Sequence, residues 1–223
     1  MKKLLSQGDQ HLIYTPNPEM CVEAHRNKYF RDILNSSTLN LCDGFGTFLM
    51  GRFLYRLNLE RVTGVDFFEA ICEQLKAKIF LLGAAPGVAK QCQLILEKKY
   101  PHLKIVGTFS GKLDSDGIKE IEKEIKKTAP EILFTAFGAP KQEIFLFENL
   151  SRFPSVKVGV GVGGTFDFIS RKQKRAPLFL RRLGLEWLFR LAREPRQRLI
   201  RIWRATVVFS FLVFREKIML ERF

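Results

Sequence analysis

The chain has 223 residues, which is enough for one sizeable α/β core or for one domain with an appendage. Hydrophobic residues make up 46% of the sequence, which argues against a generally disordered chain. The formal net charge is +14, and residues 171–223 contribute fifteen Lys and Arg against four Glu. This basic segment predicts an anionic partner, which is a phospholipid, a lipid phosphate or a nucleic acid.

The cysteines and the first residues of the chain indicate the cellular compartment in which the protein is expected. The four cysteines and three histidines are scattered and lack the close spacing of a zinc site, so free thiols in a reducing cytosol are expected. The first five residues run directly into polar sequence, so no secretory signal peptide is expected there. The predicted location is therefore cytoplasmic.

Short apolar runs alternate with helical patterns along most of the chain. This alternation predicts βαβ units, right-handed crossovers and a parallel sheet with helices on both faces, which is the α/β class. A change to basic composition near residues 170–177 predicts a catalytic core at 1–176 and a basic amphipathic helical appendage at 177–223. The expected strands are 11–15, 39–42, 79–82, 104–106, 132–137 and 156–162. The expected helices are 18–34, 45–57, 66–76, 87–100, 117–128 and 141–150.

The ends of the first two expected strands carry polar residues. In an open parallel sheet, ligands bind beyond the carboxyl ends of the strands. Thr15 and Asn17 follow the first strand and are candidates for substrate binding, with a turn capped by Asn as the equal alternative. Asp43 follows the second strand, and a carboxylate placed there can act as a general base. Asp-Gly is also ordinary loop chemistry, which is the alternative for Asp43.

The next two candidates are a cation and a glycine. Arg61 precedes a helix for which Asp66 is the expected N-cap. Its guanidinium can hold a phosphate through two hydrogen bonds, and a solvated surface charge is the alternative. Gly83 opens a run of small residues after the third strand. Small residues there allow a diphosphate to approach backbone N–H groups, or a helix to pack closely on the strand.

Residues 132–164 contain two expected strands that each end in glycine and polar residues. The first loop has the sequence GAPKQE and opens a helix whose positive end favours anions. Glu143 in the first turn of that helix suits the helix dipole. The substrate-binding candidates in the two loops are Gly138, Lys141, Gln142, Gly163 and Gly164.

Three other patterns are interpreted as structural. Residues 107–113 resemble a Walker loop, but a residue is missing between the glycines and Leu113 replaces the Mg-binding Ser or Thr, which excludes ATP hydrolysis. Asp116 is expected to cap the helix at 117–128 rather than to hold a metal. The glycines at 159, 161 and 164 match the dinucleotide fingerprint, but no acidic residue follows at the required distance, which argues against NAD.

The basic segment interleaves arginine with Leu, Trp and Phe. Its apolar run at 205–214 is too short to span a membrane, which takes about 18 or more residues. Arginine beside Trp, Phe and Leu predicts a helix that lies in the membrane interface, and a terminal helix packed on the core is the alternative. The arginines predicted to contact a lipid diphosphate or the membrane are Arg190, Arg193, Arg198, Arg201 and Arg204.

Seven sequence blocks occur in a characteristic order, namely TPNPE, CDGFG, ERVTGVD, LLGAAPGVA, FGAPKQE, GVGGTFDF and KRAPLFLRRLGLEWLFRLAREP. Over roughly residues 12–196 they resemble the WecG/TagA/CpsF glycosyltransferases, glycosyltransferase family 26. The resemblance implies a Rossmann-like core on the cytoplasmic face of the membrane. It implies inverting transfer of N-acetylmannosamine, its uronate or a hexose from a UDP-sugar to a sugar on undecaprenyl diphosphate, without a metal or other cofactor. The products would feed teichoic acid, common antigen, capsule or exopolysaccharide.

The resemblance also implies residue roles. Asp43 corresponds to the proposed base, and Thr15, Asn17, Arg61 and Gln142 to residues that line the pocket. The basic appendage would close over the site and hold the lipid diphosphate. Cys42 departs from the family pattern, in which proline is more usual before Asp-Gly. The alternative is a non-catalytic basic protein that binds nucleic acid or anionic membrane, and the interleaved Phe and Leu favour lipid over nucleic acid.

Overall fold

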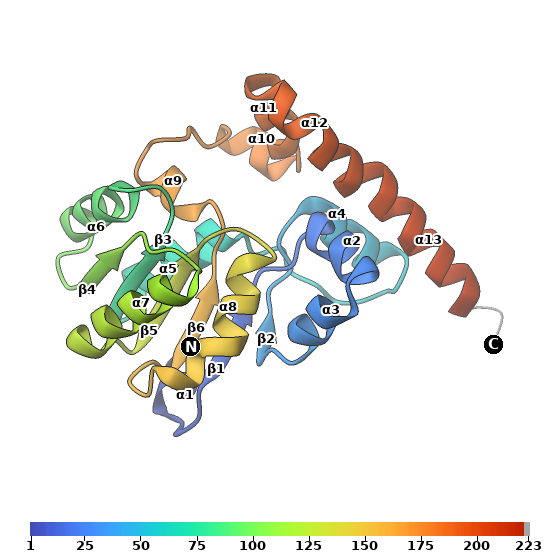
Figure 1. The fold of residues 1–223 in the computed structure, drawn as a ribbon. Helices are drawn as coiled ribbons and strands as arrows, with labels where there is room; N and C mark the ends of the chain where they lie inside the picture. Colours follow the sequence, from blue (N-terminus) through green and yellow to red (C-terminus); the bar gives the residue numbers. More distant parts are fainter. Residues whose placement is uncertain (221–223) are drawn as a thin grey trace. The chain divides into compact units, whose positions relative to one another are not determined.

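The computed structural model describes residues 1–220, with the side chains of all of these except residues 197, 198, 219 and 220. Its largest regular feature is a six-stranded sheet in which all strands are parallel and follow the order β2-β1-β6-β5-β3-β4 (Figure 1). The predicted α/β class with a parallel sheet is therefore confirmed. The strands are β1 (His11–Tyr14), β2 (Leu39–Asn40), β3 (Lys78–Gly83), β4 (Lys104–Phe109), β5 (Ile132–Ala136) and β6 (Val158–Gly161).

Helices connect the strands, and the described residues from Leu178 to Leu220 form a series of helices. Those before residue 170 are α1 (Lys2–Ser6), α2 (Pro18–Arg26), α3 (Lys28–Asn35), α4 (Phe45–Phe53), α5 (Gly64–Gln74), α6 (Val88–Lys99), α7 (Ser115–Thr128), α8 (Lys141–Asn149), the 3-10 helix η1 (Leu150–Arg152) and α9 (Thr165–Ile169). Those after it are α10 (Leu178–Arg182), α11 (Glu186–Arg193), α12 (Pro195–Trp203), the π-helix η2 (Arg204–Val208) and α13 (Phe209–Leu220).

Several predicted bounds are wrong: the helix expected at 45–57 ends as α4 at Phe53, and the strand expected at 39–42 ends as β2 at Asn40. Three further helix predictions differ because of a side-chain cap or an earlier start. The single helix expected at 18–34 is broken into α2 and α3, since Asn27 accepts a hydrogen bond from the N–H of Phe30 and so starts a new helix. The cap of α7 is Asp114, which accepts from the N–H of Gly117 at 2.8 Å, so Asp116 lies in the first turn. Asp66 likewise lies in the first turn of α5 rather than at its cap.

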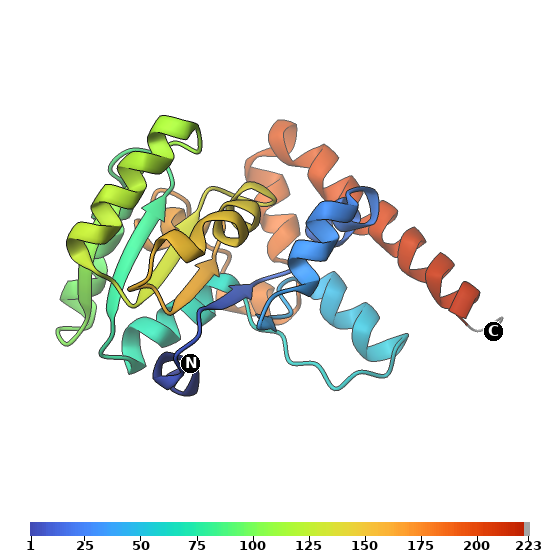
Figure 2. The ribbon, with the colours of Figure 1, turned by 60° about the horizontal axis from the view of Figure 1, so that its bottom comes forward.

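Helices cover both faces of the sheet, as the register of β5 and β6 shows (Figures 1 and 2). Phe134 of β5 faces Val160 of β6 across the ladder, and Phe134 packs edge-on against Phe68 of α5 at a centroid distance of 4.7 Å. The preceding residue of β6 is Gly159. A Cβ added there would lie on the opposite face of the sheet, 2.9 Å from Leu146 of α8. One face of the sheet therefore packs against α5 and the other against α8.

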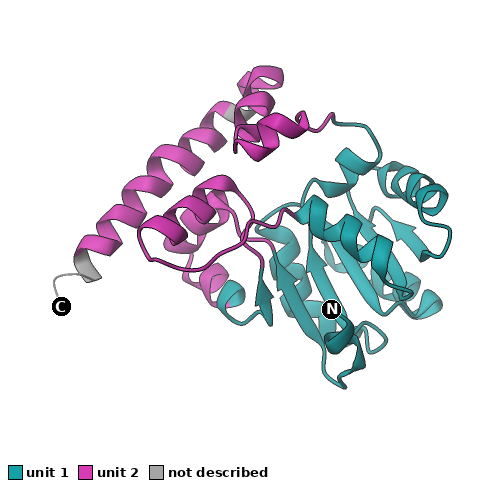
Figure 3. Ribbon diagram, turned by 180° about the vertical axis from the view of Figure 1, so that it is seen from behind, with its two compact units in different colours: residues 1–14, 33–40, 64–173 teal, residues 15–32, 41–63, 174–223 magenta. Residues whose placement is uncertain are grey.

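The chain divides into two compact units (Figure 3). Unit 1 comprises residues 1–14, 33–40 and 64–173, and it contains all six strands. Unit 2 comprises residues 15–32, 41–63 and 174–223. The C-terminal helices thus belong with two short segments that follow β1 and β2 in the sequence. The predicted boundary at 176/177 between a core and an appendage remains a prediction.

The packing of unit 2 centres on the start of α13. Phe209 is 5% exposed, and its ring lies 3.5 Å from where a Cβ would stand on Gly46 of α4. Polar contacts add to this packing on α2, since Arg201 pairs with Glu19 at 2.9 Å and His25 lies 3.5 Å from Glu216. The C-terminal helices therefore pack against α4 through Phe209 and pair with α2 through Arg201 and Glu216.

We expect Phe209→Ala to lower the free energy of unfolding by roughly 3–5 kcal/mol, because it removes a buried aromatic ring and leaves a cavity. Urea denaturation followed by circular dichroism measures the change. The matched control is Phe211→Ala two residues along, since Phe211 is 65% exposed and its loss should change stability by less than about 0.5 kcal/mol. Equal effects of the two substitutions would contradict this packing.

Candidate active site

In unit 1, Gln142 links the glycine loops that follow β5 and β6. It is 2% exposed, and its Oε1 accepts hydrogen bonds from the N–H of Gly138 at 3.2 Å and of Gly163 at 3.0 Å. Both glycines have positive φ, 80° and 53°, a backbone region that favours glycine. Three predicted site residues are therefore in direct contact, from two loops at the carboxyl ends of adjacent strands.

Glu143 lies beside Gln142 and is fully buried. The Nε2 of Gln142 donates to its Oε1 at 2.7 Å, and the Tyr14 hydroxyl donates to its backbone carbonyl at 3.3 Å. Burial raises the pKa of Glu143 to about 7, and the hydrogen bond from Gln142 only partly offsets this. The sequence predicted a first-turn residue suited to the helix dipole, and it gave no sign that the side chain is buried.

Gly161 of β6 provides the space for this pair. A Cβ built on Gly161 would lie 2.9 Å from the Oε1 of Glu143 and 3.0 Å from the Nε2 of Gln142. Close approach of two polar side chains therefore accounts for the second glycine of the pattern that resembled a dinucleotide fingerprint. The first, Gly159, lies inside β6, as the sequence indicated.

We expect Gly161→Ala to destabilise unit 1 by about 1–3 kcal/mol, because the added methyl group overpacks a fully buried site. Urea denaturation measures the loss as a lower midpoint with an unchanged slope. Gly8→Ala is the control, since nothing lies within 4 Å of a Cβ on Gly8. Full stability of Gly161→Ala would show that the Gln142–Glu143 pair can move aside without loss.

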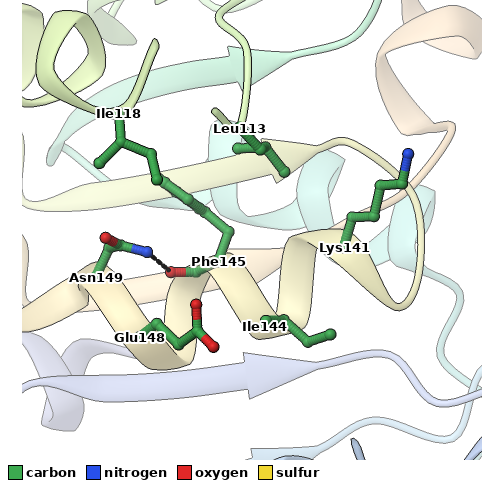
Figure 4. Close-up of a pocket in the computed structure, with 7 residues that line it drawn as sticks. All are labelled: Leu113, Ile118, Lys141, Ile144, Phe145, Glu148 and Asn149. Carbon is green, nitrogen blue, oxygen red and sulfur yellow. Dashed lines mark hydrogen bonds between the residues drawn. The ribbon is translucent and has the colours of Figure 1, made fainter. Parts of the chain in front are cut away.

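Lys141 faces a different part of unit 1 from its neighbour Gln142. It lines a cavity of about 440 Å³ between α8 and the start of α7, with Leu113 and Ile118 opposite (Figure 4). The walls from α8 are Ile144, Phe145 and Glu148, at the spacing of one helix face. The structure thus separates Lys141 from the contact between Gln142 and the glycine loops.

The remaining glycine candidates of unit 1 are Gly83, where two strands approach closely, and Gly164, which begins a helix. Gly83 has φ +99°, and a Cβ there would lie 2.9 Å from the carbonyl carbon of Ala136 on the neighbouring strand. The N–H of Ala84 donates to the carbonyl of Ala136 at 2.9 Å, although Ala84 itself has a positive φ of 61°. Gly164 is the N-cap of the short helix α9. A role of Gly83 and Gly164 in binding a diphosphate stays a prediction.

In unit 2, the three loops that carry the other candidates lie side by side. The N–H of Asp43 donates to the carbonyl of Pro16 at 3.1 Å, and the N–H of Val62 donates to the carbonyl of Cys42 at 3.1 Å. The segments containing Asn17, Asp43 and Arg61 are therefore joined by backbone hydrogen bonds. A shared substrate site formed by these three segments stays a prediction.

The loop that contains Thr15 and Asn17 also forms the Asn-capped turn that was the alternative to substrate binding. Asn17 is the N-cap of α2, and its Oδ1 accepts from the N–H of Met20 at 3.0 Å. Thr15 is 5% exposed. Substrate contact through either residue remains a prediction.

Asp43 and Arg61 occupy half-buried positions. Asp43 precedes Gly44, the N-cap of α4, and its carbonyl accepts from the Thr47 hydroxyl at 2.6 Å. The guanidinium of Arg61 donates to the carbonyl of Arg181 at 2.7 Å, so Arg61 joins its loop to the C-terminal segment. The alternative of a solvated surface charge at Arg61 does not describe this position.

The C-terminal arginines differ in their partners. Arg190 pairs with Glu186, Arg193 lies over the Phe189 ring at 5.8 Å, and Arg201 pairs with Glu19. Arg204 is exposed, and the side chain of Arg198 lies outside the described residues.

Large apolar side chains are exposed alongside these arginines. Ile200 and Trp203 are 66% and 60% exposed. The other exposed apolar side chains of the C-terminal helices include Leu178, Phe179, Leu183, Leu199 and Phe211. Across residues 1–220, no helix combines the length and the apolar character that crossing a membrane requires.

Comparison with known proteins gives consistent results. The model of the Glycosyl transferase WecG/TagA/CpsF family matches residues 1–222. The N-acetylglucosaminyldiphosphoundecaprenol N-acetyl-beta-D-mannosaminyltransferase of Bacillus subtilis (strain 168) is 34% identical over 197 residues, which are 87% of this chain and 76% of the relative. The protein of the same name from Staphylococcus aureus (strain MRSA252) is 29% identical over 80% of this chain and 70% of its own length.

Proposed function

The chain belongs to the WecG/TagA/CpsF family of glycosyl transferases, and on this basis we propose that it moves N-acetylmannosamine, its uronate or a hexose from a UDP-sugar to a sugar carried on undecaprenyl diphosphate. The names of the two relatives state transfer of N-acetylmannosamine to N-acetylglucosaminyl-diphosphoundecaprenol, which supports this acceptor class. Since the chain is a glycosyltransferase, the alternative of a non-catalytic binding protein is not retained. Synthesis of a cell-surface polysaccharide, such as teichoic acid, is the proposed context.

Asp43 is the proposed general base. Inverting transfer needs one group that takes the proton from the attacking acceptor hydroxyl while the nucleotide diphosphate leaves from the opposite face of the sugar. The observation that carries this assignment is the joining of the Asp43 loop to the loops of Asn17 and Arg61 by backbone hydrogen bonds. Arg61 is the cation of this group that can bind a phosphate.

The glycine loops of unit 1 are the proposed donor-binding elements. A leaving diphosphate is stabilised by fixed N–H donors, which cost no reorganisation during the reaction. The N–H groups of Gly138 and Gly163 themselves donate to Gln142 and hold these loops in place, so the proposed donors are the other N–H groups of the two loops, next to the starts of α8 and α9. We assign no metal or other cofactor to this transfer.

The C-terminal helices are the proposed contact with the inner face of the plasma membrane. Exposed Ile200 and Trp203 beside arginine suit a helix that lies in the lipid interface. Each Lys or Arg near an anionic leaflet contributes roughly 1 kcal/mol, so a cluster can hold the enzyme reversibly at the surface where the acceptor is.

A panel of UDP-sugars tests the proposal. Each is incubated with a short-chain polyprenyl diphosphate that carries N-acetylglucosamine, with and without EDTA, and the products are identified by mass spectrometry. We expect one N-acetylhexosamine, uronate or hexose to be added with release of UDP, at the same rate in EDTA. No transfer from any UDP-sugar of the panel would overturn the donor assignment, and loss of the reaction in EDTA would overturn metal independence.

A further inference from the structure

The buried pair of Gln142 and Glu143 is more than a structural support for α8. Gln142 uses both ends of its amide, since Oε1 accepts from two glycine N–H groups and Nε2 donates to Oε1 of Glu143. The carboxyl group thereby fixes which end of the amide faces the loops of Gly138 and Gly163. If the amide turned round, it would present N–H groups to N–H groups on one side.

The surroundings of Glu143 favour a neutral carboxylic acid. The residues next to Glu143 are Gln142 on the same helix, Tyr14 on β1 and Gly161 on β6. None of these three residues is a cation. Among the residues that the structure describes, Oε2 of Glu143 is buried and has no hydrogen-bond partner. An ionised carboxylate there would be a buried charge that the hydrogen bond from Gln142 compensates only in part, which is costly and opposes the packing around Gln142. The neutral acid avoids this cost and still accepts the hydrogen bond from Gln142.

A charge at this position would also act on the proposed ligand. The diphosphate of a nucleotide sugar is an anion, and a carboxylate one residue from Gln142 would repel it with little screening inside the protein. Neutral Glu143 removes that repulsion while the amide of Gln142 keeps the loops in register.

We propose that Glu143 is a positioning residue that acts as a neutral carboxylic acid. It orients Gln142 between the loops of Gly138 and Gly163 and leaves the protein interior next to these loops uncharged. This inference rests on the proposed function, in which these loops bind the donor. Because coupling between two sites is reciprocal, a bound diphosphate must favour the protonated form of Glu143 to the same extent. Donor binding should therefore take up a proton wherever free Glu143 is partly ionised.

The sign of the pH dependence follows from the burial of the group. Burial raises the pKa of Glu143 to about 7, so the acid is neutral below that pH and ionises as the pH rises through it. Affinity for a diphosphate should then fall as the pH rises from 7 to 8.5. In Glu143→Gln, the new amide resembles the neutral acid and removes this dependence.

Isothermal titration with UDP at pH 7.0–8.5, in two buffers of different ionisation enthalpy, tests the proposal. We expect the dissociation constant of the wild type to rise by about threefold or more relative to Glu143→Gln, with net proton uptake that the variant lacks. UDP ionises in the same way in both titrations, so the difference in affinity and proton uptake between wild type and Glu143→Gln reports on Glu143. Glu120→Gln, an exposed carboxylate on α7, is the control and should behave as the wild type. Parallel profiles and equal proton uptake in wild type and Glu143→Gln would overturn the proposal.

A second measurement needs no ligand and separates this inference from the proposed function. Amide exchange at Gly138 and Gly163, expressed as protection factors, should fall in the wild type between pH 6 and 8.5 and stay constant in Glu143→Gln. If UDP does not bind but protection follows this pattern, the donor assignment fails and the role of Glu143 as a positioning residue stands. If protection in the wild type is independent of pH, the role of Glu143 is wrong whatever UDP does, and this holds even if the variant does not fold.

Discussion

Asp43→Asn is expected to lower turnover by at least about a hundredfold, because the amide cannot take the proton from the acceptor hydroxyl. Asparagine has the same shape as aspartate, and the hydrogen bonds of residue 43 to Pro16 and Thr47 use its backbone, so the loop should keep its structure. Initial rates of UDP release with saturating donor and acceptor measure the effect. The loss should fall on kcat, with KM for both substrates little changed.

Asp116→Asn is the matched control for this experiment. Its side chain is 85% exposed in the first turn of α7. From the sequence, Asp116 is assigned to a helix start rather than to a metal site. We expect normal turnover from Asp116→Asn. Turnover of Asp43→Asn within a few-fold of the wild type would remove Asp43 as the base and would move the search to other carboxylates.

The second large effect is expected at the membrane. Replacing Ile200, Trp203 and Phe211 together by serine should weaken binding to anionic phosphatidylglycerol vesicles by at least about a hundredfold. Each of these side chains is 60% exposed or more, and burying one in an apolar phase contributes about 1.5–3 kcal/mol. Sedimentation with vesicles over a range of lipid concentrations gives the partition coefficients.

The control for the membrane experiment replaces exposed apolar side chains of unit 1. Leu94 and Phe147 are 53% and 43% exposed, and serine at both positions should leave vesicle binding unchanged. Equal losses from the two sets of substitutions would contradict a specific role of the C-terminal helices. Substitution is a sharper test than deletion of residues 199–223, since deletion would also remove Phe209 from its packing against α4.

The sequence predicted the sheet well because its signals are local. Most strands are apolar runs bounded by glycine, proline or polar residues, and alternation with helices predicts parallel pairing. The exception is β2, which is only Leu39–Asn40 and is exposed. Helix starts were less accurate, because they depend on which of several capping residues is used. Asp114 and Asp116 are both good caps, and only the geometry of the preceding turn selects Asp114.

The candidate site was predictable as a set of strand ends but not as a set of contacts. The burial of Glu143 depends on Gly161, which is distant in sequence and whose only signal is the absence of a side chain. The grouping of the C-terminal helices with α2 and α4 depends similarly on Gly46, which leaves room for Phe209. A single sequence does not reveal such pairs, because either glycine is equally consistent with an ordinary turn or helix.

Unit 2 is built from three separate segments of the chain, and this affects the order in which it can fold during synthesis on the ribosome. All six strands precede residue 162, so every strand of unit 1 is synthesised before residues 174–223, the last segment of unit 2. Helices α2 and α4, although made early, must wait for Phe209 to leave the exit tunnel before they gain their packing partner. A premature stop codon between residues 174 and 209 should therefore yield a folded sheet whose unit 2 segments lack Phe209, and chaperones that recognise exposed apolar surface should bind this product.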